Sequence, residues 1–145
     1  MITQTSETAI RLLVYMANRQ ETQPVAVHQV AADIGAAPTY AAKIVGTLVQ
    51  AGILLSQRGA KGGVELAKDT TEIRMLDIVQ ACQNLVTEIY CQPAEKGSCQ
   101  VCGYHTAMGQ LHQSVLAVLG TWTLANLAQK PVGTVEGQVH SVCTM

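Results

Sequence analysis

The sequence predicts a mainly α-helical fold with a small β-hairpin wing: a winged helix-turn-helix followed by a long helix. Three observations support this prediction. Two short amphipathic segments, 28–35 and 40–51, are separated by a tight turn. A basic, glycine-rich tip at 58–63 lies between two β-type runs, and an apolar seam with heptad spacing begins near residue 103. Apolar residues make up 48% of the chain and aromatic residues only 3%, so we expect an aliphatic, helix-rich core.

The first predicted helix spans residues 6–18. Ser6 is a plausible N-cap, and Glu7 in the first turn suits the helix dipole. The apolar residues recur with helical spacing at Ile10, Leu13, Val14 and Ala17. A polar loop over residues 19–26 follows this helix.

The next two predicted helices form the helix-turn-helix. The first spans about 28–35 and ends at Gly35, and the second spans 40–51, with Thr39 as its N-cap and Gly52 as its stop. Pro38 lies in the turn between them. In this motif the second helix enters the major groove of DNA, so we expect that role for the helix beginning near Thr39.

The runs at 53–57 and 64–67 are predicted to pair as a hairpin. The tip between them carries two cations on a flexible, glycine-rich stretch, which suits a wing lying along the DNA backbone or in the minor groove. A planar guanidinium such as that of Arg58 suits a narrow minor groove. The residues that we expect to contact DNA are Thr39, Tyr40, Lys43, Arg58, Lys61, Gly62 and Gly63.

Beyond the wing we expect a helix over 75–83, an irregular segment over 84–102 and a long helix beginning near Gly103. Gly120 could end this helix early and leave Thr123 to cap a short last helix. The seam has two interpretations: it packs against a second copy of the chain, or against its own domain. The predicted dimer-interface residues are Tyr104, Met108, Leu111, Val115, Val118 and Trp122.

Charge and composition narrow the class of protein. The net charge is −1, but residues 1–68 hold six basic and four acidic residues, so the first half is the better candidate for facing phosphates. No apolar run is long enough to cross a bilayer and no signal peptide is recognisable, so we expect a cytoplasmic protein without a membrane partner. No acid/base pair, nucleophile constellation or cofactor loop is recognisable, so we do not expect an enzyme.

Three cysteines and a histidine follow the pattern C-x7-C-x2-C-x2-H at Cys91, Cys99, Cys102 and His105. Thiolates bind iron or zinc, and three of them with one further ligand complete a tetrahedral site. The spacing leaves three alternatives open: an iron–sulfur cluster, a zinc site, or a thiol–disulfide switch at Cys99 and Cys102. Cys82, on the apolar side of a helix, is expected to be a small core residue.

The chain resembles the Rrf-two family of bacterial regulators, which includes the iron–sulfur regulator IscR and the nitric-oxide sensor NsrR. The resemblance covers residues 1–128. The wing motif RGxxGG and the three cysteines before the long helix are its most specific parts. The other stretches that carry it are SETAIRLLVYMA at 6–17, YAAKIVGTLVQAG at 40–52 and EIRMLDIVQA at 72–81.

The resemblance implies a homodimer of winged-helix subunits that binds a nearly palindromic DNA operator, acting as a repressor under redox, nitric-oxide or iron–sulfur control. It implies an iron–sulfur cluster, 2Fe–2S rather than 4Fe–4S, on Cys91, Cys99 and Cys102, with zinc as the alternative metal. The fourth ligand is His105 in one version and Glu7 of the partner subunit in another. The interval between Cys99 and Cys102 is shorter than the commoner family spacing.

This organisation divides the chain into four parts: a DNA-binding domain over 1–83, a cysteine loop over 84–102, a dimerisation helix over 103–128 and a flexible tail over 129–145.

Overall fold

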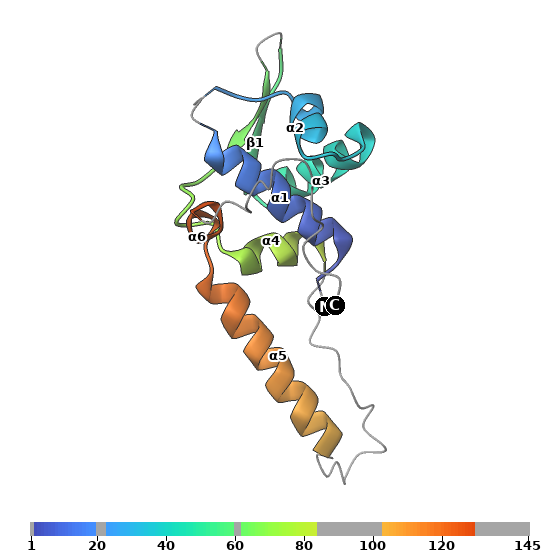
Figure 1. Ribbon diagram of the computed structural model, residues 1–145, viewed down its shortest axis with the longest axis vertical. Coiled ribbons are helices and arrows are strands. Elements are labelled where there is room, and N and C mark those ends of the chain that lie inside the picture. Colours follow the sequence, from blue (N-terminus) through green and yellow to red (C-terminus); the bar gives the residue numbers. More distant parts are fainter. Residues whose placement is uncertain (1, 20–22, 60–61, 84–102, 130–145) are drawn as a thin grey trace, which may run out of the picture.

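The computed structural model describes residues 2–19, 23–59, 62–83 and 103–129. Within them, six helices and one two-stranded antiparallel hairpin follow one another (Figure 1). The fold class is therefore confirmed. The elements are α1 (Gln4–Asn18), α2 (Val27–Asp33), α3 (Pro38–Gln50), β1 (Leu54–Gln57), β2 (Gly63–Leu66), α4 (Met75–Cys82), α5 (Gly103–Thr121) and α6 (Leu124–Ala128).

Helix α1 begins earlier than its sequence predicts. Thr3 is the N-cap, because its Oγ1 accepts a hydrogen bond from the backbone N–H of Ser6 at 3.3 Å. Ser6 lies inside the helix and is fully buried, so the prediction that it is the cap was wrong. Both residue types are good caps, and the packing around Ser6 decides between them.

Helix α3 also begins before the predicted position. Its N-cap is Ala37 and Pro38 occupies the first turn, where a missing backbone N–H costs nothing. Thr39 is thus a helical residue and not the cap. The two glycines expected to end the helices do so: Gly35 and Gly52 both have a φ of +68°, a left-handed conformation that glycine adopts without strain.

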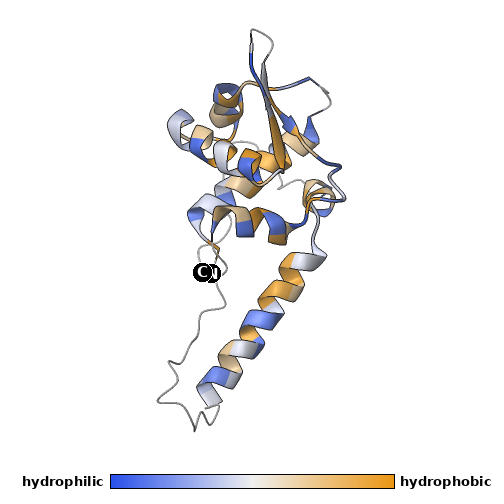
Figure 2. Cartoon of the chain, turned by 180° about the vertical axis from the view of Figure 1, so that it is seen from behind, coloured by the Kyte–Doolittle hydropathy of each residue, from blue (hydrophilic) through white to orange (hydrophobic). Residues whose placement is uncertain are grey.

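The core lies where α1, α3 and α4 face one another, and Figure 2 shows apolar residues gathered there. Helix α1 runs through the centre and contacts α2, α3, α4 and α6. The core is aliphatic, as the composition predicts. Its largest fully buried apolar side chains are Leu12, Leu13, Ile44, Leu48, Leu54, Ile73, Ile78 and Leu124.

The hairpin pairs Leu54 with Leu66 and Gln57 with Gly63 in antiparallel register. Val25 adds a bridge on the outer side of β2, since its N–H and C=O exchange hydrogen bonds with Val64 at 3.0 and 2.9 Å. The loop before α2 is thereby attached to the wing, which fixes the hairpin beside the helix-turn-helix.

Helix α5 extends away from this core, and α6 returns the chain to α1 (Figure 1). The junction is held by backbone bonds: Met75 N–H donates to Trp122 O, and Leu124 N–H to Ile73 O, both at 2.8 Å. Thr123 caps α6 through the N–H of Asn126. Of the two possible ends of the long helix, the structure therefore has the early one, followed by a short last helix.

Candidate functional site

The second helix of the helix-turn-helix, α3, presents a polar side to solvent. Ala41, Ile44 and Leu48 are buried, which turns Thr39 and Lys43 outward. Both exposed residues are among those predicted to contact DNA. Ala42 is exposed beside them, so this surface is open and carries few long side chains.

Tyr40 has a different environment from its two neighbours on α3. It is half-buried, and its hydroxyl donates a hydrogen bond to Oγ1 of Thr5 on α1 at 3.0 Å. The side chain therefore joins the start of α3 to the start of α1. Its predicted contact with DNA stays a prediction.

Two residues of α1 hold the turn of the helix-turn-helix in place. Nη2 of Arg11 donates to the carbonyl oxygen of Ile34 at 2.8 Å, where α2 ends. The hydroxyl of Tyr15 donates to Asp33, and this hydrogen bond raises the pKa of Tyr15 above its ordinary value. Sequence reasoning missed both contacts, because they join residues 23 and 18 positions apart and leave no local pattern.

At the wing, Arg58 is exposed at the end of β1, and Gly59 follows it with a φ of +120°. Lys61 lies outside the described residues. Gly62 and Gly63 have a structural reason to be glycine: a Cβ on Gly62 would lie 2.8 Å from the Gly59 carbonyl oxygen, and one on Gly63 would lie 2.7 Å from the Val25 carbonyl carbon. These distances are far below van der Waals contact.

The predicted cysteine ligands Cys91, Cys99 and Cys102 lie outside the described residues. Both candidates for the fourth ligand lie inside them. Glu7 is exposed in the first turn of α1, and His105 is half-exposed in the first turn of α5. Among the described residues, no group of three or more His, Cys, Asp or Glu side chains is placed to hold a metal.

Comparison with known proteins identifies the family. A family model described as "Rrf2: Iron-dependent Transcriptional regulator" matches residues 2–130. The chain belongs to the Rrf2 family. The resemblance inferred from the sequence is therefore confirmed, and the protein is a transcriptional regulator and not an enzyme.

Solved structures of Rrf2 regulators share the fold of this chain. CymR of B. subtilis, the global cysteine regulator of that organism, has a TM-score of 0.75 at 21% identity, and the match covers 89% of this chain and 96% of CymR. IscR of T. potens has a TM-score of 0.73 at 20% identity, covering 89% and 86%. The oxidised form of CymR from Staphylococcus aureus has a TM-score of 0.71 at 23% identity, covering 90% and 97%.

The long helix of this Rrf2 protein carries an exposed apolar strip. Four of the six residues predicted for the dimer interface face solvent: Tyr104 (60% exposed), Leu111 (49%), Val118 (58%) and Trp122 (37%). The other two, Met108 and Val115, are half-buried. The neighbouring side of the helix is covered near its end, where Leu119 is buried and α4 packs against α5.

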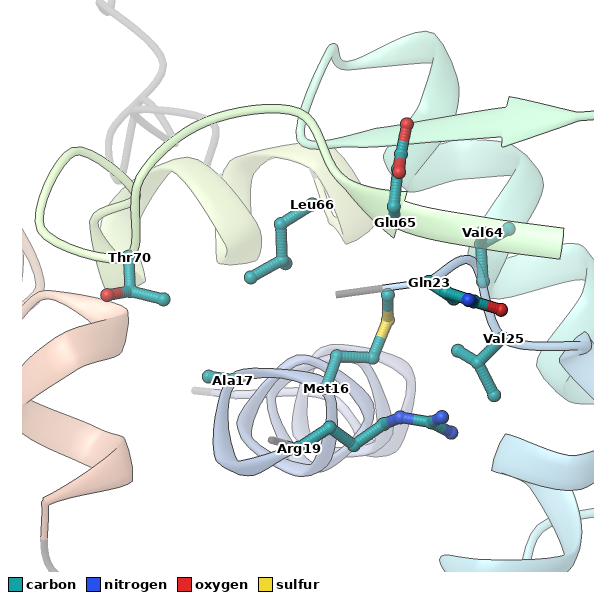
Figure 3. A pocket seen from close by; sticks show the side chains of 9 residues that line it. All are labelled: Met16, Ala17, Arg19, Gln23, Val25, Val64, Glu65, Leu66 and Thr70. Carbon is teal, nitrogen blue, oxygen red and sulfur yellow. The ribbon is translucent and has the colours of Figure 1, made fainter. Parts of the chain in front are cut away.

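A hollow of about 290 Å³ lies between the end of α1 and the base of the wing (Figure 3). Met16, Val25, Val64 and Leu66 supply its apolar lining. The carboxylate of Glu65 turns away from it and accepts a hydrogen bond from Gln57 Nε2 at 2.9 Å. None of the residues predicted for DNA, metal or dimer contact lines this hollow.

Cys82 packs at the edge of the core. Its side chain is half-buried, and burial raises the pKa of its thiol, which disfavours the thiolate that a ligand or nucleophile needs. This environment agrees with the expected packing role. No helix in the described part of the Rrf2 chain combines the length and apolar character that a transmembrane span requires.

Proposed function

We propose that this Rrf2 protein is a homodimeric repressor that inserts α3 into the major groove of an operator and lays its wing along the adjacent minor groove or backbone. The single observation that supports this best is the outward-facing pair Thr39 and Lys43 on α3. This helix packs beside the hairpin whose tip carries exposed Arg58. Such a regulator acts in the cytoplasm.

In this proposal the α3 side chains and the wing have different tasks. Thr39 reads base edges as a hydroxyl donor or acceptor, and Lys43 reaches a base edge or a phosphate. Tyr40 presents its ring edge near the groove while its hydroxyl stays on Thr5. Arg58 enters the minor groove, and Lys61 with the backbone of Gly62 and Gly63 follows the phosphates.

The exposed strip on α5 supports the homodimer. An apolar side chain such as Tyr104 or Val118 that is more than half exposed gains free energy when a second copy covers it. A dimer also matches an operator of two half-sites, because paired readers need a fixed spacing. We therefore assign Tyr104, Met108, Leu111, Val115, Val118 and Trp122 to the contact between subunits.

We assign the sensing function to Cys91, Cys99 and Cys102. Three thiolates within twelve residues supply three of the four ligands that a 2Fe–2S cluster takes. The Glu7 carboxylate is exposed and makes no hydrogen bond or ion pair with other described residues. It is therefore available as a fourth ligand from the partner subunit. When bound, the cluster supplies redox-active iron. His105 is the alternative fourth ligand, and it would keep the site within one subunit.

The two candidate fourth ligands would affect the proposed DNA-reading helix by different routes. Glu7 belongs to α1, the helix that contacts α3, so its binding would act on the DNA-reading helix directly. His105 belongs to α5, so its effect would pass through the long helix and the backbone junction at Trp122.

The spacing of Cys99 and Cys102 favours a second candidate, a thiol–disulfide switch or a zinc site. The fold is shared with the CymR proteins, of which the B. subtilis protein is a cysteine regulator and the Staphylococcus aureus protein was solved in an oxidised form. The DNA-binding part of the proposal is the same for both candidates.

Purification without oxygen separates these candidates. We expect a brown protein that absorbs in the visible range and contains iron and acid-labile sulfide in equal amounts. Colourless protein with one zinc per subunit would show that the site binds zinc and not a cluster. Colourless, metal-free protein with an oxidisable Cys99–Cys102 pair would favour the thiol–disulfide switch. Failure to select any duplex from a random-sequence DNA pool would contradict the DNA-binding function itself.

A further inference from the structure

The side chain of Gln83 holds the first turn of α1. Its Oε1 accepts a hydrogen bond from the backbone N–H of Thr3 at 2.8 Å and another from Oγ of Ser6 at 2.9 Å. Gln83 is the residue that caps α4, and its own N–H donates to the carbonyl oxygen of Val79 at 2.9 Å. The end of α4 is thus joined to the start of α1 across 77 residues of sequence.

The burial of Ser6 makes this contact specific. Ser6 is 0% exposed, so its hydroxyl has no access to bulk water, and a buried hydroxyl without a partner is costly. Oγ of Ser6 also lies 3.1 Å from Oγ1 of Thr3, the residue that caps α1. The side-chain oxygen Oε1 of Gln83 has two lone pairs, and both accept hydrogen bonds from the same turn of α1.

The position of this contact in the chain connects it to the proposed sensor. The segment with the three cysteines begins at the residue after Gln83, and Glu7 is the residue after Ser6. Thr5, in the same turn of α1, accepts the hydrogen bond from Tyr40 on α3. Hydrogen bonds therefore connect Gln83, which directly precedes the cysteine segment in sequence, through the first turn of α1 to the proposed DNA-reading helix α3.

We propose that Gln83 is a positioning residue, which fixes the first turn of α1 relative to the end of α4, where the cysteine segment begins in sequence, and so transmits the state of the cysteines to α3. The proposal rests on the sensing function proposed above. A contiguous set of contacts does not by itself establish coupling, so the test measures coupling directly.

The test compares three substitutions in the full-length dimer. Gln83→Met removes the acceptor and keeps the length of the side chain, whereas Gln83→Glu keeps an acceptor at the same place. Gln80→Met is the matched control, because Gln80 is an exposed glutamine on the same helix. Each protein is measured with its metal or reduced thiols in place, and again after chelation or oxidation.

Two readouts are taken. Hydrogen–deuterium exchange measures the exchange rates of the amides in the first two turns of α1. Titration of a duplex selected by the wild-type protein gives the ratio of DNA affinities before and after chelation or oxidation. In Gln83→Met we expect exchange in these turns to rise at least tenfold and the affinity ratio to fall at least fivefold. Gln83→Glu and Gln80→Met keep both values near those of the wild type.

Unchanged exchange, or an unchanged affinity ratio, in folded Gln83→Met overturns the proposal. If that variant does not fold, Ser6→Ala removes one of the two hydrogen bonds and leaves Gln83 in place, and the same two changes are expected at smaller size. If the wild-type protein binds DNA equally well before and after chelation or oxidation, the sensing function and the coupling are both overturned. The exchange measurement then still decides whether Gln83 holds α1.

Discussion

The hydroxyl of Tyr40 donates a hydrogen bond to Oγ1 of Thr5 at 3.0 Å, and this bond joins the first turn of α3 to the first turn of α1. The contact crosses 35 residues of sequence and is partly buried. Ala37 makes no side-chain cap hydrogen bond at the start of α3, so the Tyr40–Thr5 bond is a side-chain link that holds this turn against α1. In the proposed function α3 reads DNA, so we expect binding to depend on how its first turn is held.

Replacing Tyr40 by Phe tests this contact. The ring stays and only the hydroxyl is lost, so we expect the free energy of unfolding to fall by about 0.5–1.5 kcal/mol. Thr5→Val should cost a similar amount, and the double variant should cost less than the two single variants added together, because they share one bond. Chemical denaturation measures all three. Strictly additive costs would show that the two side chains do not interact in solution.

The glycines of the wing give a second prediction. Gly63→Ala would place a Cβ 2.7 Å from the Val25 carbonyl carbon, so the bridge between Val25 and Val64 must open. We expect a loss of about 1–3 kcal/mol in the free energy of unfolding.

The matched control for Gly63→Ala is Gly46→Ala. Gly46 is exposed inside α3, and outside the adjoining backbone of its own helix no atom lies within 4 Å of a Cβ built there. Alanine at this position should stabilise the protein by about 0.5–1 kcal/mol through helix propensity. Thermal unfolding distinguishes the two variants. Equal melting temperatures would contradict the close approach at the wing.

Arg58 supplies the third prediction, which concerns DNA. Its guanidinium is exposed at the wing, and Arg58→Ala should weaken binding to a selected duplex by about 1–3 kcal/mol if it contacts a groove. Lys68→Ala is the control, since Lys68 is an exposed cation beyond the other end of the hairpin. Titrations at one fixed salt concentration are required, because a lost cation weakens binding less at high salt. Equal affinities of the two variants would remove Arg58 from the interface.

Periodicity and turn residues predicted five of the six described helices and both strands, and they left the short helix α6 as one of two alternatives. They could not choose the helix starts. Thr3 and Ser6 are both good N-caps, and only the contact of Ser6 with Gln83, distant in the sequence, decides that Ser6 lies inside the helix. Arg11 and Tyr40 were not recognised as joining helices for the same reason: their partners are distant in sequence and leave no local pattern.

The candidate site was predictable to a different extent in each part. Exposed Thr39, Lys43 and Arg58 follow from the pattern of a winged helix. The heptad pattern grouped six residues on one side of α5, but spacing alone cannot say what covers them. In the structure Met108 and Val115 are already partly covered, whereas the remaining four face solvent. The cysteine ligands lie outside the described residues and stay predictions.

The last prediction concerns this exposed strip. Leu111 is 49% exposed in the isolated subunit, so a charge at this position costs little before assembly. In a dimer closed along α5, Leu111→Glu would be buried without a partner and would cost several kcal/mol. We therefore expect this variant to be a folded monomer at low micromolar concentration, where we expect the wild type to be a dimer. Sedimentation equilibrium measures this difference, and circular dichroism confirms the fold.

Gln113→Glu is the control for this substitution. Gln113 is exposed on α5, two positions further along, and helical geometry puts it on the side opposite Tyr104, away from the strip. It introduces the same charge on the same helix, so a general effect of charge on α5 would dissociate both variants. Dissociation of Leu111→Glu alone assigns the strip to the subunit interface. If Leu111→Glu is folded and remains dimeric, the subunits meet elsewhere, and the strip is covered by the chain's own remaining residues.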